Sequence, residues 1–448
     1  MVNRRRFVQT VIAATAAPVA ARSMPGATGF GRLRADPRRI LDLPAGFRYD
    51  IVARAGEPMD DGLLVPGKAD GMAAFAGPDG NVVLVCNHEN APASAGNGPF
   101  GADLERLRAA ADAYIYDAGG GTTPGNGGTS TIVYDPRRRQ RVRQHMSLLG
   151  TELNCAGGAT PWGSWLSCEE CFSGPGTSFE SGRVLVREQR HGYVFEVPSA
   201  ASTAVEPLPL KAMGRFEHEA AAVDPATGIV YLTEDRHRSL FYRFVPATRG
   251  RLAAGGSLQA LAMAGRPSFD TRNWDAAARL EPGEWHAVTW IDLQDVDGDD
   301  NDLRLRGHAA GAARFARGEG LCPADGELVF TCTIGGAARL GQVFAYRPGR
   351  GSGGHLKLLA ESNEDSLLRH ADNLTLSPWG DLVICEDTAD HCGLVGIAPD
   401  GRQYPLADNA YTASELAGIC FSPRGDVMFV NIQDDGLTLA ITGPWRTV

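Results

Sequence analysis

Carboxylate and amide side chains recur at the ends of short apolar segments along this sequence. The residues at these positions are Glu89, Glu169, Glu170, Glu219, Glu234, Asp235, Glu319, Asp372, Asn373, Glu386 and Asp387. If they meet in one cleft, they cannot all stay ionised without cations, because neighbouring like charges disfavour the charged form. Ca²⁺ takes about six to eight oxygen ligands and suits such a set, and Mg²⁺ or Mn²⁺ would also fit. The pattern therefore predicts a site for hard cations.

Cys155 offers a different kind of ligand. It stands in the run Asn154-Cys-Ala-Gly-Gly158, where small residues leave space around the thiol. A thiolate beside carboxylates favours a transition metal such as iron over calcium. A cysteine in such surroundings can also be a small buried apolar residue. From the residues alone, both interpretations stay open.

Arg317 lies two residues before Glu319, so on an extended chain both side chains point the same way. The planar guanidinium fork matches a phosphate or a carboxylate. Two interpretations follow: Arg317 binds an anion held between it and the cations, or it forms a salt bridge with Glu319 alone.

These residues need elements that bring them together, and similar segments along the chain provide such elements. They span residues 80–89, 163–170, 228–235, 326–332, 380–387 and 425–431. Each starts at a glycine, continues as an apolar run and ends in polar or acidic residues. Apolar and β-branched runs of this length predict strands, and the glycine predicts a hairpin turn before each strand.

Another short strand precedes each of these segments. The preceding strands open at Asp70, Asn154, His218, Glu319, Asp372 and Ala417. Six such strand–turn–strand units predict an all-β fold, a six-bladed β-propeller with long insertions between blades, formed as a single domain by residues 42–448. The innermost strands of a propeller line a central channel, and their starting ends meet at one mouth. We therefore expect the polar residues of all units to converge there.

The N-terminal sequence resembles an export signal, although a basic chain end without such a function is the alternative. Arg4, Arg5 and Arg6 precede an apolar stretch from Val8 to Ala21, a pattern that predicts a twin-arginine signal peptide over residues 1–21. That stretch is shorter than the ~20 residues of a membrane-spanning helix. We expect a linker over residues 22–41, export by the twin-arginine machinery, and a periplasmic or secreted protein without a membrane span in the mature chain.

The formal net charge of −10 argues against a nucleic-acid-binding protein. Binding to a phosphate backbone needs clustered lysines and arginines. An acidic surplus is typical of a protein that collects cations.

Several motifs together resemble one family. They are Asn87–Glu89, Gly150–Gly158, Cys168–Glu170, Gly214–Glu219 and Ala371–Leu374. From about Asp42 to the C-terminus the chain resembles the PhoX-type alkaline phosphatases. The resemblance implies a propeller whose mouth holds Fe³⁺ and Ca²⁺, export by the twin-arginine route, and hydrolysis of small-molecule phosphomonoesters.

The resemblance also implies roles for individual residues. Cys155 matches the cysteine ligand to iron, and Glu89, Glu219 and Glu319 match carboxylates of the metal cluster. The residues expected to supply further ligands are Glu169, Glu234, Asp372 and Glu386. The residues expected to hold the substrate phosphate are Asn154 and Arg317. Gly318 departs from the family pattern, which has proline between the arginine and the glutamate.

Two other functions remain open from the sequence. One is a calcium-dependent lactonase or phosphotriesterase-like hydrolase on the same fold, which calcium without Cys155 as a ligand would favour. The other is an exported metal-binding protein without enzymatic activity, which metal binding without ester turnover would favour.

Overall fold

The fold is built almost entirely from β-strands. The computed structural model describes residues 29–446, apart from residues 109, 111–113, 278 and 350–352. These residues contain one α-helix, α1 (Leu303–Ala309). The predicted signal peptide lies outside the described residues. A search of the described residues for membrane-crossing helices found none.

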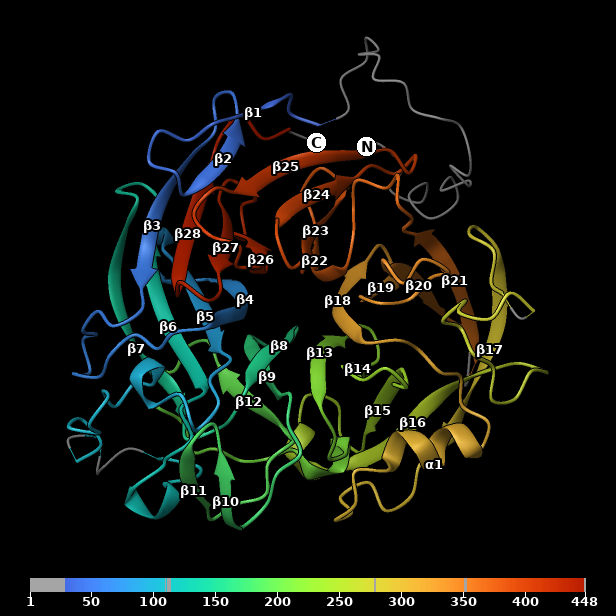
Figure 1. The fold of residues 1–448 in the computed structure, drawn as a ribbon, viewed down its shortest axis with the longest axis horizontal. Coiled ribbons are helices and arrows are strands. Elements are labelled where there is room, and N and C mark those ends of the chain that lie inside the picture. Colours follow the sequence, from blue (N-terminus) through green and yellow to red (C-terminus); the bar gives the residue numbers. More distant parts are fainter. Residues whose placement is uncertain (1–28, 109, 111–113, 278, 350–352, 447–448) are drawn as a thin grey trace.

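The strands form antiparallel sheets that surround the centre of the molecule (Figure 1). One sheet holds β4 (Ala69–Ala76), β5 (Val82–His88), β6 (Gly128–Asp135) and β7 (Gln140–Leu149). The next holds β8 (Asn154–Ala159), β9 (Ser164–Glu169) and β12 (Val194–Pro198), and β10 (Gly176–Glu180) pairs with β11 (Arg183–Arg187) between β9 and β12. A third holds β26 (Leu416–Phe421), β27 (Met428–Ile432), β28 (Leu437–Thr442) and β3 (Arg48–Arg54). A fourth holds β22 (Ala371–Leu376), β23 (Leu382–Glu386), β24 (Gly393–Ile397), β25 (Gln403–Asn409), β2 (Leu41–Pro44) and β1 (Leu33–Arg34).

The largest sheet joins two such groups edge to edge. One group is β13 (His218–Val223), β14 (Val230–Glu234), β15 (Tyr242–Pro246), β16 (Gly256–Met263) and β17 (Trp285–Asp292). The other is β18 (Gly318–Ala324), β19 (Glu327–Cys332), β20 (Gln342–Pro348) and β21 (Gly354–Glu361). The link is the pairing of β17 with β21.

The first strand of each group lies at the centre of the molecule, and we call β4, β8, β13, β18, β22 and β26 the ring strands. Each contacts the next, and β26 contacts β4. In Figure 1 they face the centre, with the later strands of each group farther out. The pairing of β3 with β28 joins the N-terminal and C-terminal parts of the chain in one sheet. This is a propeller-like arrangement.

The ring strands and their partners confirm the strands expected from the sequence. Each predicted opening falls within one residue of the start of a ring strand, and each glycine-led segment contains or overlaps the following strand. Part of the predicted linker is also in the sheet, since β1 and the start of β2 extend the edge at β25. Local strand signals therefore located the elements that position the site.

Buried side chains hold these sheets against each other. Phe241 of one group stacks on Phe330 of the next with 4.3 Å between ring centroids, and Phe330 stacks on Phe344 at 5.2 Å. Burying each such ring contributes about 1.5–3 kcal/mol. All nine cysteines are free and buried, with Cys86 in β5 and Cys385 in β23. Packing, not crosslinking, fixes the ring strands.

Candidate metal centre

The same irregularity occurs near the start of every ring strand. In β4, Ala69 pairs with His88 and Met72 pairs with Cys86, so the ring strand has one residue more than its partner between the two pairs. Equivalent shifts occur in the other ring strands. An extra residue of this kind is a β-bulge, which bends the strand and redirects a side chain.

The first residue within each bulge carries the chemistry. In five ring strands this residue is Asp70, Cys155, Glu219, Glu319 or Asp372. In the sixth it is Gly418, where a Cβ atom would lie 2.1 Å from the carbonyl oxygen of Asp70. A side chain does not fit there, so β26 contributes no ligand at the equivalent position.

Four of the bulge residues and one residue next to β9 form a compact group. This group, which we call the mouth cluster, consists of Cys155, Glu170, Glu219, Glu319 and Asp372. Ligand atoms of Cys155, Glu170 and Glu219 lie within 4.8 Å of one another, and so do those of Glu219, Glu319 and Asp372. Glu219 belongs to both triplets and is only 3% exposed. The geometry allows two cations to share Glu219 as a ligand.

A second set of acidic residues follows the partner strands. Glu89 follows β5, Glu170 follows β9, Asp235 follows β14 and Asp387 follows β23. Asp235 and Asp387 both contact Arg317 at the mouth. Because side chains alternate along a strand, the residue just before each of these acids faces away from the mouth.

This alternation separates three predicted ligands from the mouth cluster. Glu169 accepts a hydrogen bond from His191 at 2.7 Å, Glu234 accepts one from the Tyr242 hydroxyl at 2.7 Å, and Glu386 accepts one from a backbone N–H at 2.9 Å. The structure brings Glu89, Cys155, Glu219, Glu319 and Asp372 together at the mouth but not these three. Metal binding by Glu169, Glu234 and Glu386 stays a prediction, without support from this geometry.

Burial and mutual repulsion raise the pKa values of the acids at the mouth. Burial first, and neighbouring carboxylates next, raise the pKa values of Glu219, Asp70 and Glu319 well above their usual range. Burial also raises the pKa values of Glu89 and Asp372 to about 7. In the absence of cations, these groups retain protons at a pH where exposed carboxyls are ionised.

The mouth has more buried acceptors than donors. Gln433 donates its side-chain amide to Asp70 at 3.0 Å and to Glu89 at 2.9 Å. Glu219 and Glu415 accept no side-chain hydrogen bond from the residues that the structure describes. Burying carboxylates without donors or cations is unfavourable. This donor set fits bound cations.

Cys155 lies inside this acidic group. Its thiol is 3% exposed and donates to the carbonyl oxygen of His218 at 3.2 Å. Burial raises the pKa of the thiol, and the carboxylates of Glu219 and Glu170 raise it further. A bound cation would favour the thiolate, since the thiolate is the metal-binding form. The location favours the ligand interpretation of Cys155, and its binding of iron stays a prediction.

Arg317 makes a larger set of ion pairs than the sequence indicates. Its guanidinium donates to both carboxylate oxygens of Asp235, at 2.8 and 2.9 Å, and to Glu319 at 2.9 Å. Asp387 lies 3.7 Å away. The side chain is 28% exposed and lines two cavities, of about 430 and 830 Å³. Arg317 is therefore accessible to an anion that enters either cavity.

Asn154, the other residue predicted to hold phosphate, is fully buried in a hydrogen-bond network. Its side-chain oxygen accepts from the N–H of Gly128 and from the hydroxyl of Thr151, both at 2.7 Å. Its side-chain nitrogen donates to Ser167 at 2.9 Å. These contacts fix the start of β8, directly before Cys155. Contact between Asn154 and substrate stays a prediction.

Sequence reasoning left several residues at the mouth out of the candidate ligands. Asp70 and Glu415 belong to the acidic group, and Gln433 joins it as a donor. Asp70 was expected at the mouth as the polar opening of its strand but was not named as a ligand, although its position before Gly71 in β4 matches that of Glu319 before Gly320 in β18. Gln433 follows β27 as Glu89 follows β5, and the motif Val430–Gln433 is one of those that resemble the family, but its amide was not predicted as a ligand. Glu415 lies outside the repeated positions, so no pattern marked it.

The smaller cavity has a basic wall. Arg236, Arg238, Arg304 and Arg317 line it, together with Glu170 and Asp235. Arg236 follows Asp235 directly in the sequence, and Arg238 comes two residues later. The repeated sequence pattern marks acidic strand ends. It did not predict the arginines that follow Asp235.

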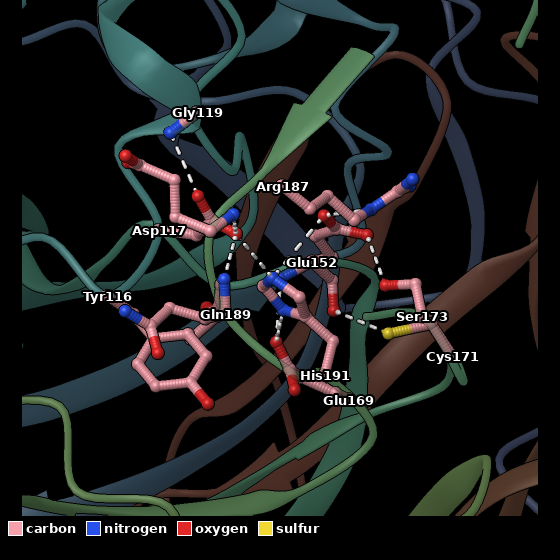
Figure 2. A network of polar contacts seen from close by, with 12 residues as sticks. Tyr116, Asp117, Gly119, Glu152, Glu169, Cys171, Ser173, Arg187, Gln189 and His191 are labelled. Atoms are coloured by element: carbon pink, nitrogen blue, oxygen red, sulfur yellow. Dashed lines mark hydrogen bonds and ion pairs between the residues drawn. The ribbon is translucent and has the colours of Figure 1, made fainter. Parts of the chain in front are cut away.

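Figure 2 shows a separate polar network around His191, which we call the His191 network. His191 lies between Glu169, at 2.7 Å, and Asp117, at 3.1 Å. Although burial opposes the charged form, these carboxylates raise the pKa of His191 to about 10. Arg187 pairs with Glu152 at 2.7 Å in the same network. The His191 network thus contains its own cations.

Comparison with known proteins gives a family and a related structure. The family model described as alkaline phosphatase PhoX matches residues 28–436. The structure of Pseudomonas fluorescens PhoX in complex with vanadate, described as a transition state analogue, has a TM-score of 0.69 at 18% sequence identity. That match covers 93% of this chain and 98% of the other, and it shows a shared fold.

A gluconolactonase of Xanthomonas campestris is also similar, with a TM-score of 0.42 at 11% identity, over 93% of this chain and 99% of the other. The search of curated proteins found no match.

Proposed function

The chain belongs to the PhoX family of alkaline phosphatases, and on this premise we propose that it is a metal-dependent phosphatase that hydrolyses phosphomonoesters at the mouth cluster. One observation carries the proposal: a buried thiol and several buried carboxylates gather at the start of the ring strands, directly beside Arg317. A cation site next to an accessible guanidinium suits a phosphate, because the metal ions and the guanidinium together neutralise the negative charge on its oxygens.

The architecture that we propose is a propeller of six blades. Each ring strand would be the innermost strand of one blade. The support is the repeated bulge, which recurs at one place in each ring strand, and the contact of each ring strand with the next.

The ions that we propose are Ca²⁺ and Fe³⁺. Carboxylate oxygens suit calcium, and a thiolate among them favours iron. Cys155, Glu170 and Glu219 would hold one ion, and Glu219, Glu319 and Asp372 another. When bound, such ions supply Lewis-acid stabilisation of the phosphate charge during hydrolysis.

Arg317 would orient the phosphate. Its two N–H groups on Asp235 have the parallel geometry that also fits two phosphate oxygens. A phosphate would compete with Asp235 for this fork, and Glu319 would keep the guanidinium in place. The partial burial of Arg317 strengthens such an ion pair, because less water screens it.

We also propose export by the twin-arginine route to the periplasm or the outside of the cell. The support is the arginine run before the apolar stretch of residues 8–21. Export of a folded chain would allow the ions to be inserted before secretion.

Exchange of the thiol tests the proposed centre. Cys155→Ser should lower the iron content, because a hydroxyl is a poor ligand for iron. Phosphomonoester hydrolysis should fall at least about 100-fold while the protein stays folded. Cys168→Ser is the matched control, since Cys168 is a buried cysteine on the neighbouring strand β9. The control should lose stability and keep its iron. Metal analysis, p-nitrophenyl phosphate turnover and circular dichroism on the same preparations give the readouts.

Three outcomes would contradict parts of the proposal. Calcium without iron in the wild-type protein removes Cys155 from the ligand set. Bound metal without hydrolysis of any phosphomonoester indicates a metal-binding protein instead of a phosphatase. Equal turnover per folded molecule in Cys155→Ser and wild type assigns Cys155 to core packing.

A further inference from the structure

Several arginines line a cavity that Arg317 and Glu170 of the mouth also line. Arg236 and Arg238 lie in the connection from β14 to β15, and Arg304 comes from α1. With Arg317 they line the cavity of about 430 Å³, which we call the arginine cavity. A volume of this size is within the range of small-molecule sites, about 300–1,000 Å³.

The arginines of this wall differ in how protein carboxylates neutralise them. Arg304 lies 3.7 Å from Glu234 and 3.9 Å from Glu217. Arg236 also pairs with Glu217, so two guanidinium groups share that carboxylate. The side chain of Arg236 is 47% exposed, whereas that of Arg304 is 16% exposed. Arg304 is thus held by the protein, and Arg236 is only partly neutralised.

Arg238 differs from the other arginines of this cavity in its lack of a partner among the described residues. It is exposed and makes no hydrogen bond or ion pair with any residue that the structure describes. A free guanidinium that lines a cavity offers two parallel N–H donors to an incoming anion. Such a group fits a carboxylate or a phosphate equally well.

We propose that the arginine cavity binds a second anionic group of the substrate. The preferred substrates are then phosphomonoesters whose alcohol carries a carboxylate or another phosphate. The inference rests on the proposed phosphatase function. In this arrangement the scissile phosphate binds at Arg317, and the second anion binds at Arg238 and Arg236, which line the same cavity.

The test compares two substrates that differ in charge alone. 4-Carboxyphenyl phosphate and 4-carbamoylphenyl phosphate have nearly the same shape, and their leaving groups are similar. We expect the metal-loaded wild-type enzyme to favour the carboxylate by about fivefold in kcat/KM, mostly through KM, which is the size of an exposed ion pair. Arg238→Ala should bring the ratio close to one, and Arg238→Glu should invert it. The preference should also fall with added salt.

Two further arms complete the design. Arg251→Ala removes an exposed arginine that does not line the cavity, so it should leave the ratio and both rates unchanged. 1,4-Phenylene bisphosphate replaces the carboxylate by a phosphate. The probe whose kcat/KM falls more in Arg238→Ala carries the anion that the cavity prefers. A larger fall for the carboxylate and a larger fall for the phosphate both support the inference.

The contradicting outcomes separate this inference from the function on which it rests. Equal kcat/KM for the carboxylate and amide probes in wild type, or a preference that survives in Arg238→Ala, overturns the inference and leaves the phosphatase proposal standing. Hydrolysis of neither probe by metal-loaded protein overturns the phosphatase proposal, and the inference falls with it.

Discussion

The mouth cluster and the His191 network are both buried and rich in acidic residues, yet they are neutralised in different ways. They meet at the end of β9, where Glu169 belongs to the His191 network and Glu170 to the mouth cluster. Although burial opposes it, hydrogen bonds from His191 and from backbone N–H groups lower the pKa of Asp117. Burial and neighbouring carboxylates raise the pKa of Glu170.

The difference teaches where this protein depends on ions from solution. In the His191 network, His191 and Arg187 supply the positive charge, so the carboxylates are paired within the chain. At the mouth, more carboxylates face fewer donors, and Arg317 contacts three of them at once. A buried charge is tolerated only where it is paired. The mouth is therefore the region whose charges need external cations.

Removal of cations should have the largest effect and should act on the mouth alone. A chelator should lower phosphomonoester hydrolysis at least about 100-fold. It should also lower the melting temperature, because an ion that binds only the folded chain stabilises it by mass action. Calcium and iron together should restore both. Unchanged melting temperature after complete metal removal would contradict an occupied site.

The chelated protein should also gain stability as the pH falls. Folding raises the pKa values of Glu89 and Asp372 to about 7, from ordinary values of 4.5 and 3.8. The folded chain therefore holds protons that the unfolded chain has released, so this stability is present at low pH and is lost as the pH rises through about 7. Melting curves at pH 5 and pH 8, with and without metals, measure it. A metal-loaded protein should show a smaller pH effect.

His191→Gln should damage the other region. It leaves Glu169 and Asp117 without their shared cation, and breaking a buried ion network costs about 3–5 kcal/mol of unfolding free energy. Molecules that remain folded should keep their calcium and iron. His355→Gln, an exposed histidine on β21, is the control and should change little.

The pH dependence sharpens this second prediction. Folding raises the pKa of His191 to about 10 from an ordinary value of 6.5. Its stabilising contribution is therefore complete below about pH 6.5 and is lost as the pH rises through 10. The gap in denaturant stability between wild type and His191→Gln should narrow between pH 8 and pH 10. A gap that stays constant would show that His191 acts by packing alone.

The sequence predicted the strands of the ring because each is marked locally. A glycine turn and an apolar run identify β5, β9, β14, β19, β23 and β27, and a polar opening identifies each ring strand. Glu219, Glu319 and Asp372 stand at or directly after these openings, so their location at the mouth was expected, whereas the bulges that redirect their side chains were not. Their convergence required only that the ring strands meet at one mouth.

Which acid of each strand-end pair reaches the mouth was not predictable in the same way. Glu169 and Glu170 differ by one position, and one position reverses the direction of a side chain. The end of β9 therefore decides between the cluster and the His191 network, and no local signal marks that end to within one residue. His191 itself is 22 residues from Glu169 and sits outside any repeat.

Substitution of Arg317 should have the smallest effect on activity among these changes. It tests whether Arg317 only pairs with protein carboxylates or also binds the substrate phosphate. If Arg317 serves only as a counter-ion, as Arg187 does for Glu152, lysine should replace it with little loss. If it also holds phosphate, Arg317→Lys keeps the charge but loses the fork that binds two oxygens. Catalytic efficiency on a phosphomonoester should then fall about tenfold, which corresponds to roughly 1.4 kcal/mol of transition-state binding. Metal content should stay the same, because neither the arginine nor the lysine side chain binds a metal ion in its positively charged form. Glu319→Gln on the same strand should instead lower metal content and rate together. Unchanged kinetics in Arg317→Lys, with phosphate inhibiting at its original affinity, would make Arg317 a counter-ion and move the anion site elsewhere.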